Sequence, residues 1–211
     1  MSEVNLVWVT PKADEVIAYC ARVSNPSNQH NMETAPRLLR YLRKHRHWSP
    51  FEMASVCLEI VTTRDIARQI LRHRSFSFQE FSQRYAEATD FADLTEPRLQ
   101  DEKNRQNSIE TDDQYLNQWW KMAQHRVLGD SEYMYKEALG KGIAKEVARK
   151  LLPEGLTMSR LYMSGTVRSW IHYLEVRTGV ETQKEHREIA LLCQNELECL
   201  MPTVFGEHDG A

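Results

Sequence analysis

The sequence predicts an α+β fold, a mixed domain in which a small and mostly antiparallel sheet is surrounded by several helices. Segments with helical periodicity outnumber segments that alternate like strands. The few strand-like segments are scattered between the helices. The chain has 211 residues, a length typical of one domain, so we expect residues 1–211 to form a single unit.

The first half of the chain carries both strand and helix signals. The run V-N-L-V-W-V-T alternates like a strand before Pro11, and Pro36 suits the first turn of a helix. Phe76 and Phe78 alternate with polar residues, but Phe81 breaks the alternation, which indicates a bend that would let the polar residues around it converge. We expect strands at 4–10, at 53–62 and through the two phenylalanines, and helices at 13–22, 36–46 and 63–72.

The second half of the chain is mostly helical. Val167, Trp170, Ile171 and Leu174 have the spacing of one buried helix face, and Gly179 ends that helix. Charged and polar residues dominate 93–113, which predicts a flexible loop. We expect helices at 114–128, 130–140, 143–152, 166–178 and 182–200, one strand at 156–164, and a polar tail from 202.

Composition limits the classes of function. The hydrophobic content of 41% and the charged content of 27% are ordinary for a globular protein. The net charge of −3 gives no global basic field that would attract DNA or RNA. Arginines nevertheless outnumber lysines, which favours directed contacts to phosphate or carboxylate groups. A compositional bias of the genome is the alternative explanation.

The four cysteines, Cys20, Cys57, Cys193 and Cys199, form no C-x-x-C pair and have no histidine at metal-ligand spacing. We therefore expect reduced, mostly structural thiols, no metal site and a cytoplasmic protein. The N-terminus has no signal-peptide pattern, and no apolar run approaches the length of a membrane span.

The most informative segment runs from Arg72 to Arg84 and reads R-H-R-S-F-S-F-Q-E-F-S-Q-R. Guanidinium groups bind phosphate through two parallel hydrogen bonds and stack on flat rings. Several arginines interleaved with phenylalanines therefore predict a site for an anion that carries a planar group, such as a nucleotide. The alternative is a solvated basic helix end followed by a core strand.

Two further segments are candidates for the same site. The run H-R-H-W-S-P-F-E at 45–52 places histidine, serine and glutamate at a corner between helix and strand. Arg168 and His172 lie one turn apart on the polar face of a helix, so both can reach one ligand. A solvated capping turn and an ordinary polar helix face are the respective alternatives. The sequence has no glycine-rich phosphate loop, so side chains must hold the anion.

These segments together resemble the flavin-dependent thymidylate synthase family. The signature of that family is R-H-R, seven residues, then serine with arginine two positions later, here Arg72 to Arg74 followed by Ser82 and Arg84. Four other blocks fall in family order, namely A-R-V-S at 21–24, the histidine corner at 45–52, E-V-A-R at 146–149, and R-S with L-x-V-R at 168–177. Gln79, Thr166 and His172 stand where asparagine is common, which marks a divergent member.

The resemblance implies an activity, cofactors and site residues. It implies a homotetramer with shared sites that makes dTMP from dUMP, with bound FAD, NADPH as reductant and methylenetetrahydrofolate as one-carbon donor. Arg177 would lie against the uracil and act catalytically, and Tyr85 would lie near the folate and flavin rings. The residues implied for the cofactor are His47, Ser49, Arg72, His73, Arg74, Glu80, Thr166, Val167, Arg168 and His172. Those implied for dUMP are Gln69, Arg72, Glu80, Ser82, Arg84, Arg149 and Arg177.

An enzyme of this kind needs no sulfur nucleophile. Uracil C5 is a poor nucleophile, and a fixed cation beside the developing negative charge can activate the ring electrostatically. None of the cysteines lies beside the cationic segments in the sequence. Other functions stay open at this point: a related FAD-dependent enzyme that modifies another pyrimidine nucleotide or leaves a hydroxymethyl group, a flavin-binding scaffold without catalysis, or a module that binds single-stranded nucleic acid.

Overall fold

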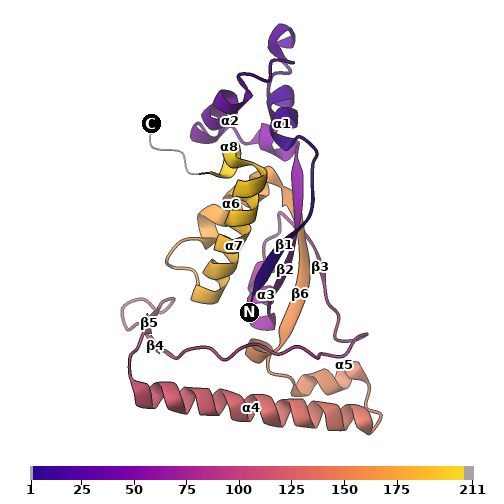
Figure 1. The fold of residues 1–211 in the computed structure, drawn as a ribbon, viewed down its shortest axis with the longest axis vertical. Helices are drawn as coiled ribbons and strands as arrows, with labels where there is room; N and C mark the ends of the chain where they lie inside the picture. The colour runs from indigo at the N-terminus through magenta and orange to yellow at the C-terminus, as the bar shows by residue number, and fades with distance from the viewer. Residues whose placement is uncertain (1, 207–211) are drawn as a thin grey trace.

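A four-stranded antiparallel sheet forms the centre of the protein (Figure 1). The computed structural model describes residues 2–206. The strands lie in the order β1-β2-β6-β3. Their bounds are Glu3–Val9 for β1, Ser55–Thr63 for β2, Met158–Thr166 for β6 and Ser77–Glu80 for β3. Each neighbouring pair is antiparallel, and the predicted α+β class with a small antiparallel sheet is confirmed.

Two long helices cover one face of this sheet, as Figure 1 shows. Helix α6 (Val167–Arg177) follows β6 directly, and α7 (Lys184–Leu200) packs against α6, β1 and β2. The short helix α3 (Arg64–Ile70) continues from the end of β2.

The remaining elements lie at the two ends of the sheet (Figure 1). At one end are α1 (Ala13–Ala21), α2 (Ala35–Lys44), α8 (Pro202–Phe205) and the 3₁₀ turns Pro26–Asn28 and Ser49–Glu52. At the other end are α4 (Gln114–Gly140), α5 (Lys145–Ala148) and the 3₁₀ turns Arg149–Leu151 and Glu154–Leu156. A two-stranded hairpin, β4 (Arg98–Gln100) and β5 (Ser108–Glu110), lies beside α4.

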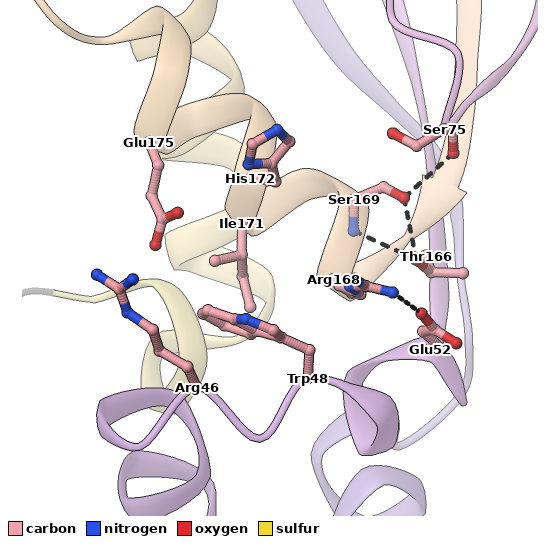
Figure 2. A pocket seen from close by; sticks show the side chains of 10 residues that line it. All are labelled: Arg46, Trp48, Glu52, Ser75, Thr166, Arg168, Ser169, Ile171, His172 and Glu175. Carbon is pink, nitrogen blue, oxygen red and sulfur yellow. Dashed lines mark hydrogen bonds and ion pairs between the residues drawn. The ribbon is translucent and has the colours of Figure 1, made fainter.

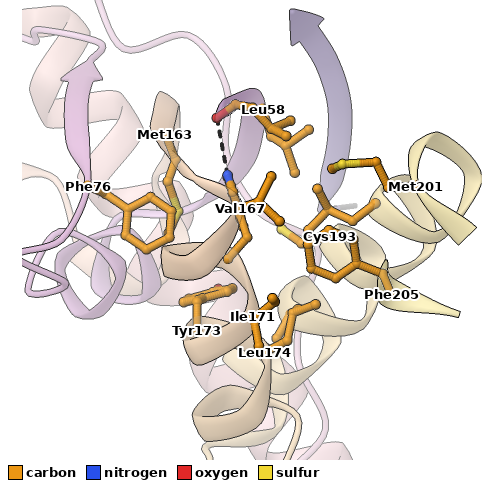
Figure 3. Close-up of a cluster of buried hydrophobic side chains, with 14 of the residues drawn as sticks. Leu58, Phe76, Met163, Val167, Ile171, Tyr173, Leu174, Cys193, Met201 and Phe205 are labelled. Atoms are coloured by element: carbon orange, nitrogen blue, oxygen red, sulfur yellow. Dashed lines mark hydrogen bonds between the residues drawn. The ribbon is translucent and has the colours of Figure 1, made fainter. Parts of the chain in front are cut away.

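The core between the sheet and α6 is built around Trp170, which is fully buried (Figure 3 shows part of this core). Its indole nitrogen donates to the backbone oxygen of Val56, at 3.1 Å. Phe76 packs edge-on against the indole, with ring centroids 4.9 Å apart. Because Phe76 belongs to the arginine- and phenylalanine-rich segment and directly precedes β3, the core fixes where that segment enters the sheet.

Most elements match the sequence-based prediction to within a few residues, but four parts differ. The segment 93–113, predicted to be a loop, contains the hairpin of β4 and β5. The helices predicted at 114–128 and 130–140 are one helix, α4, because a glycine inside a helix costs only about 1 kcal/mol and does not end it. The helix predicted at 143–152 is only one turn, α5, followed by a 3₁₀ turn. The tail predicted to be polar contains α8, with Val204 and Phe205 buried in the core.

Gly165 lies where β6 passes under Phe76, and this contact gives a stability prediction. A Cβ atom at Gly165 would lie 2.4 Å from Phe76 Cδ1. The buried ring would have to move, so we expect Gly165→Ala to lower the free energy of unfolding by about 1–3 kcal/mol. Gly129 is a matched control inside α4, since a Cβ there meets nothing within 4 Å.

We expect Gly129→Ala to raise the free energy of unfolding by about 0.5–1 kcal/mol, because alanine loses less backbone entropy in a helix. Urea unfolding followed by tryptophan fluorescence measures both variants. An unchanged midpoint for Gly165→Ala would show that the ring does not press on β6.

Candidate functional site

A pocket of about 680 Å³ opens between the segment 46–52 and helix α6 (Figure 2). Its walls combine guanidinium, imidazole, carboxylate, hydroxyl and indole groups. The lining residues are Arg46, Trp48, Glu52, Ser75, Thr166, Arg168, Ser169, Ile171, His172 and Glu175. Figure 2 shows Arg46 and Glu175 on one side of the pocket and the Arg168–Glu52 ion pair on the other.

Local backbone structure sets the positions of these side chains. Arg46 follows the end of α2 in the left-handed region, with φ 56°, a conformation that a residue other than glycine seldom adopts. Thr166 caps α6, since its hydroxyl accepts from the backbone N–H of Ser169 at 3.2 Å. The hydroxyl of Ser169 donates to the backbone oxygen of Ser75 at 3.1 Å. These contacts attach the arginine-rich segment to the first turn of α6.

The pocket suits an anion joined to a flat ring. The first turn of α6 presents the positive end of the helix dipole, and the guanidinium groups of Arg46 and Arg168 add positive charge. Trp48 contributes a flat apolar surface. This set of groups fits a dinucleotide with phosphates and a planar ring system.

Several residues predicted to bind the cofactor lie at this pocket. Thr166, Arg168 and His172 line it, and Ser49 begins the 3₁₀ turn directly after Trp48. His47 is exposed and packs against Tyr41, with ring centroids 5.9 Å apart. Val167 is fully buried in the core, so its side chain cannot reach the pocket.

A second cluster surrounds Arg177 at the other end of α6. The Nε of Arg177 donates to Nε2 of His73, at 2.9 Å. Because that nitrogen accepts, the imidazole carries its proton on Nδ1 and is neutral. Burial, followed by the charge of Arg177, lowers the pKa of His73 to about 4. Burial and the same guanidinium lower the pKa of His186 to about 3.

No carboxylate forms an ion pair with Arg177 in the part of the chain that the structure describes. Arg177 is half-buried, so its charge is only partly screened by water. A partly buried cation without an anion is unfavourable by itself. The arrangement therefore favours a ligand that brings negative charge to Arg177.

A third cluster lies between β3 and α5. The guanidinium of Arg84 lies 3.5 Å from Glu146 and 5.6 Å from the ring centre of Tyr85, which is exposed. Ser82 accepts a hydrogen bond from the backbone N–H of Arg84. Arg149, which is half-buried, begins the 3₁₀ turn that follows α5. The predicted phosphate-binding residues Ser82, Arg84 and Arg149 therefore lie in one region.

The predicted bend does not bring Glu80 to this third cluster. Glu80 ends β3 and accepts from the hydroxyl of Ser159 at 2.8 Å. It also lies 3.8 Å from Arg64. The backbone N–H of Phe81 donates to the backbone oxygen of Arg160, so pairing with β6 continues past Glu80. This pairing keeps Glu80 beside β6, and the chain turns away toward α5 only after it.

The other predicted residues lie around the end of α3. Arg72 and Arg74 are exposed on either side of His73. Gln69 is held by two hydrogen bonds, one from its amide nitrogen to Gln183 at 2.7 Å and one between its oxygen and His186 at 3.3 Å.

Sequence reasoning missed Tyr173, Gln183 and His186. Tyr173 is fully buried and lies 3.2 Å from His186. His186 is spaced with Ile189, Ala190 and Cys193 on the buried face of α7, where it looks like a core residue. The only available signal was a histidine within that apolar stripe.

The cysteines do not contribute to these clusters. Cys57 lies in β2 and Cys193 in the core, and burial raises the pKa of both thiols. All four cysteines are free. Within residues 2–206, no three histidine, cysteine, aspartate or glutamate residues are grouped as metal ligands. The same residues include no helix with the length and apolarity needed to cross a membrane.

Known proteins are similar to this chain in sequence and in fold. A family model described as thymidylate synthase complementing protein matches residues 5–203. The chain is 54% identical over 189 residues to a flavin-dependent thymidylate synthase from Synechocystis, which covers 90% of this chain and 86% of that protein. It is 52% identical over 182 residues to a probable flavin-dependent thymidylate synthase of Paramecium bursaria Chlorella virus 1, covering 86% and 84%.

A solved structure is also similar. The UMP/dUMP methylase PolB from Streptomyces cacaoi, bound with 5-Br dUMP, superposes with a TM-score of 0.84 at 28% sequence identity. The match covers 97% of this chain and 93% of that protein.

The two buried histidines predict how stability depends on pH. Their pKa values are lower in the folded protein than the ordinary 6.5, so the unfolded chain binds more protons between pH 6.5 and about 4. The stability that they contribute is complete above pH 6.5 and decreases as the pH falls through this range. Each proton adds a slope of at most about 1.4 kcal/mol per pH unit, reduced for the partly exposed His73 by solvent screening.

Urea midpoints at pH 7 and pH 5.5 measure this slope. We expect His73→Gln to reduce it, because glutamine keeps an acceptor for Arg177 but does not titrate. The exposed His30→Gln is the matched control and should retain the slope. Equal slopes for both variants would contradict a neutral His73 in the folded state.

Proposed function

Because the chain belongs to the flavin-dependent thymidylate synthase family, we propose that it converts dUMP to dTMP by reductive methylation with FAD as cofactor. We further propose methylenetetrahydrofolate as the one-carbon donor and NADPH as the reductant. The uncompensated guanidinium of Arg177 is the observation that carries this proposal, because the reaction needs a fixed cation where negative charge develops on the pyrimidine.

The pocket between 46–52 and α6 is suited to hold FAD. Arg168 and the first turn of α6 would bind the diphosphate, and Trp48 would contact a flat ring. When bound, the flavin supplies the hydride chemistry that no amino-acid side chain provides. The protein then has to bind and orient the cofactor and the nucleotide, and to exclude water.

Arg177 would stabilise the negative charge of the pyrimidine. A guanidinium beside uracil favours the ring form that has lost the N3 proton, and this form is a better nucleophile at C5. His73 accepts the hydrogen bond from Nε of Arg177, and the other N–H groups of the Arg177 guanidinium stay available to the ligand. This electrostatic route needs no sulfur nucleophile. The thiols of Cys57 and Cys193 are poorly suited to that role, because burial raises their pKa values.

The cluster of Ser82, Arg84 and Arg149 would hold the phosphate of dUMP. Each charge-assisted hydrogen bond to a phosphate oxygen contributes about 1.5–3 kcal/mol. Arg84, which pairs with Glu146, would exchange that contact for the incoming phosphate.

We propose that two or more copies share each site, in a homotetramer. Arg84 lies beside α5, whereas Arg177 lies at the end of α6 beside His73. No hydrogen bond or ion pair between described residues joins these two clusters. If both bind one nucleotide, the simplest arrangement takes each cluster from a different copy. We also propose a cytoplasmic location, which agrees with four free cysteines.

The absorbance spectrum of the purified protein tests the cofactor. We expect flavin bands that change when dUMP is added, and product mass after incubation with dUMP, UMP or dCMP identifies the pyrimidine. The solved relative named as a UMP/dUMP methylase makes UMP the alternative substrate to include. A colourless protein that binds single-stranded DNA in a salt-dependent way would contradict the proposal.

Two arginine variants test the shared site. We expect Arg177→Ala to keep FAD and lose turnover, and Arg84→Ala to weaken dUMP binding with FAD retained. Co-expression of the two inactive variants should restore activity, because random mixing leaves about one site in four with both arginines. The exposed Arg126→Ala serves as the control and should keep wild-type kinetics.

No recovery in the mixture, together with proof that the two chains assemble, would show that one copy supplies both arginines. Parallel loss of FAD and dUMP in Arg177→Ala would indicate that Arg177 has only a structural part.

A further inference from the structure

A chain of hydrogen bonds links five side chains behind the Arg177 cluster. The bonds run from Gln183 to Glu185 at 3.0 Å, from Gln69 to Gln183 at 2.7 Å, between His186 and Gln69 at 3.3 Å, and between Tyr173 and His186 at 3.2 Å. It begins at the surface and ends in the core, where Tyr173 and His186 are fully buried.

Glu185 fixes the direction of every bond in this chain. Arg98 donates to its carboxylate at 2.5 Å. Burial acts to raise the pKa of Glu185, but the hydrogen bonds to the carboxylate, including the one from Arg98, lower that pKa overall. An ionised carboxylate only accepts, so Gln183 must present its NH₂ group to Glu185. The oxygen of Gln183 then faces Gln69, which must present its own NH₂ group to it.

The same constraint continues into the core. With its nitrogen directed at Gln183, Gln69 turns its oxygen to His186, so Nδ1 of that imidazole must carry the proton. Burial, followed by the nearby guanidinium of Arg177, disfavours a second proton on the ring. Nε2 is therefore an acceptor and receives a hydrogen bond from the hydroxyl of Tyr173, whose own pKa is raised by burial.

We propose that His186 is a positioning residue, which holds the amide of Gln69 so that Gln69 offers an N–H group, and not its oxygen, to the pyrimidine nucleotide. This inference rests on the proposed function, in which Gln69 contacts dUMP. One N–H of Gln69 is left over after its bond to Gln183, and the Gln69 side chain is partly exposed. The carbonyl groups of uracil and the oxygens of phosphate are acceptors, so a fixed donor matches them.

Without His186, the bond to Gln183 is the one remaining restraint of this chain on the Gln69 amide, and rotation by 180° would present the amide oxygen to the ligand. A glutamine oxygen that faces a carbonyl or phosphate oxygen makes no hydrogen bond, and the ligand group loses its partner. Rotation also breaks the bond to Gln183. Preorganisation of this kind affects nucleotide affinity and leaves the separate pocket at 46–52 unchanged.

Substitutions at His186 test the proposal by calorimetric titration with dUMP. His186→Leu removes the donor, whereas His186→Asn keeps an N–H at the position of Nδ1. We expect His186→Leu to weaken dUMP binding about tenfold, as for the loss of one net hydrogen bond, and His186→Asn by about threefold or less. FAD content should be unchanged in both, and the exposed His30→Leu is the matched control.

A double-mutant cycle shows whether the effect passes through Gln69. In a Gln69→Ala background, His186→Leu should have no further effect on dUMP affinity. The same weakening in both backgrounds, or no weakening in either, would overturn the proposal. So would equal losses for the leucine and asparagine variants.

The tautomer of His186 in the wild-type protein gives a readout that needs no ligand. Spectra of ¹⁵N-histidine-labelled protein, assigned by comparison with His186→Asn, should show a neutral ring protonated on Nδ1 at pH 7. A ring protonated on Nε2 overturns the proposal. If the wild-type protein binds no dUMP while the Nδ1 tautomer is present, the proposed function fails and the hydrogen-bond chain itself stands.

Discussion

The charge of Arg177 is the feature on which the rest of the site depends. Its guanidinium is half-buried and bonded to a neutral imidazole, and no carboxylate among residues 2–206 forms an ion pair with it. Burial and this charge together keep His73 and His186 neutral. A neutral His73 can accept from Arg177 and a neutral His186 can hold Gln69, so burial and this one cation together set the protonation of both imidazoles.

One rigid helix connects the two functional regions within a single copy. Thr166, which caps α6, lines the pocket together with Arg168 and His172 of that helix, and Arg177 lies in its last turn. Trp170, between them, is bonded to β2 and packed against Phe76. Movement of α6 would therefore disturb both regions and the core together. This coupling explains why the site is carried by a helix and a strand pair and not by loops alone.

The distribution of polar groups separates two tasks of the enzyme. The pocket at 46–52 has cations, hydroxyls and an indole, which suit a large cofactor, whereas the Arg177 cluster has neutral donors and acceptors around one cation, which suit a pyrimidine ring. We propose that a third cluster, beside α5, binds the phosphate. Separation of this kind lets binding energy at the phosphate orient a ring whose activation depends only on electrostatics.

Periodicity by itself predicted most of the helices and strands, and the density of arginine and phenylalanine identified the segment 72–84, because both signals are local in the chain. The hairpin of β4 and β5 and helix α8 were not predicted. Gly129 misled the prediction of α4, since a single glycine does not outweigh the rest of a long helix. Only the tertiary structure decided that Glu80 turns to Arg64 and away from Arg84, and that Val167 belongs to the core. His186 could not be identified from the sequence, because its proposed role depends on its hydrogen-bond partners. Gln69 is more than a hundred residues away in the chain, and Tyr173 is thirteen residues away. Hydrogen bonds between distant side chains depend on folded distances, and no local pattern records them.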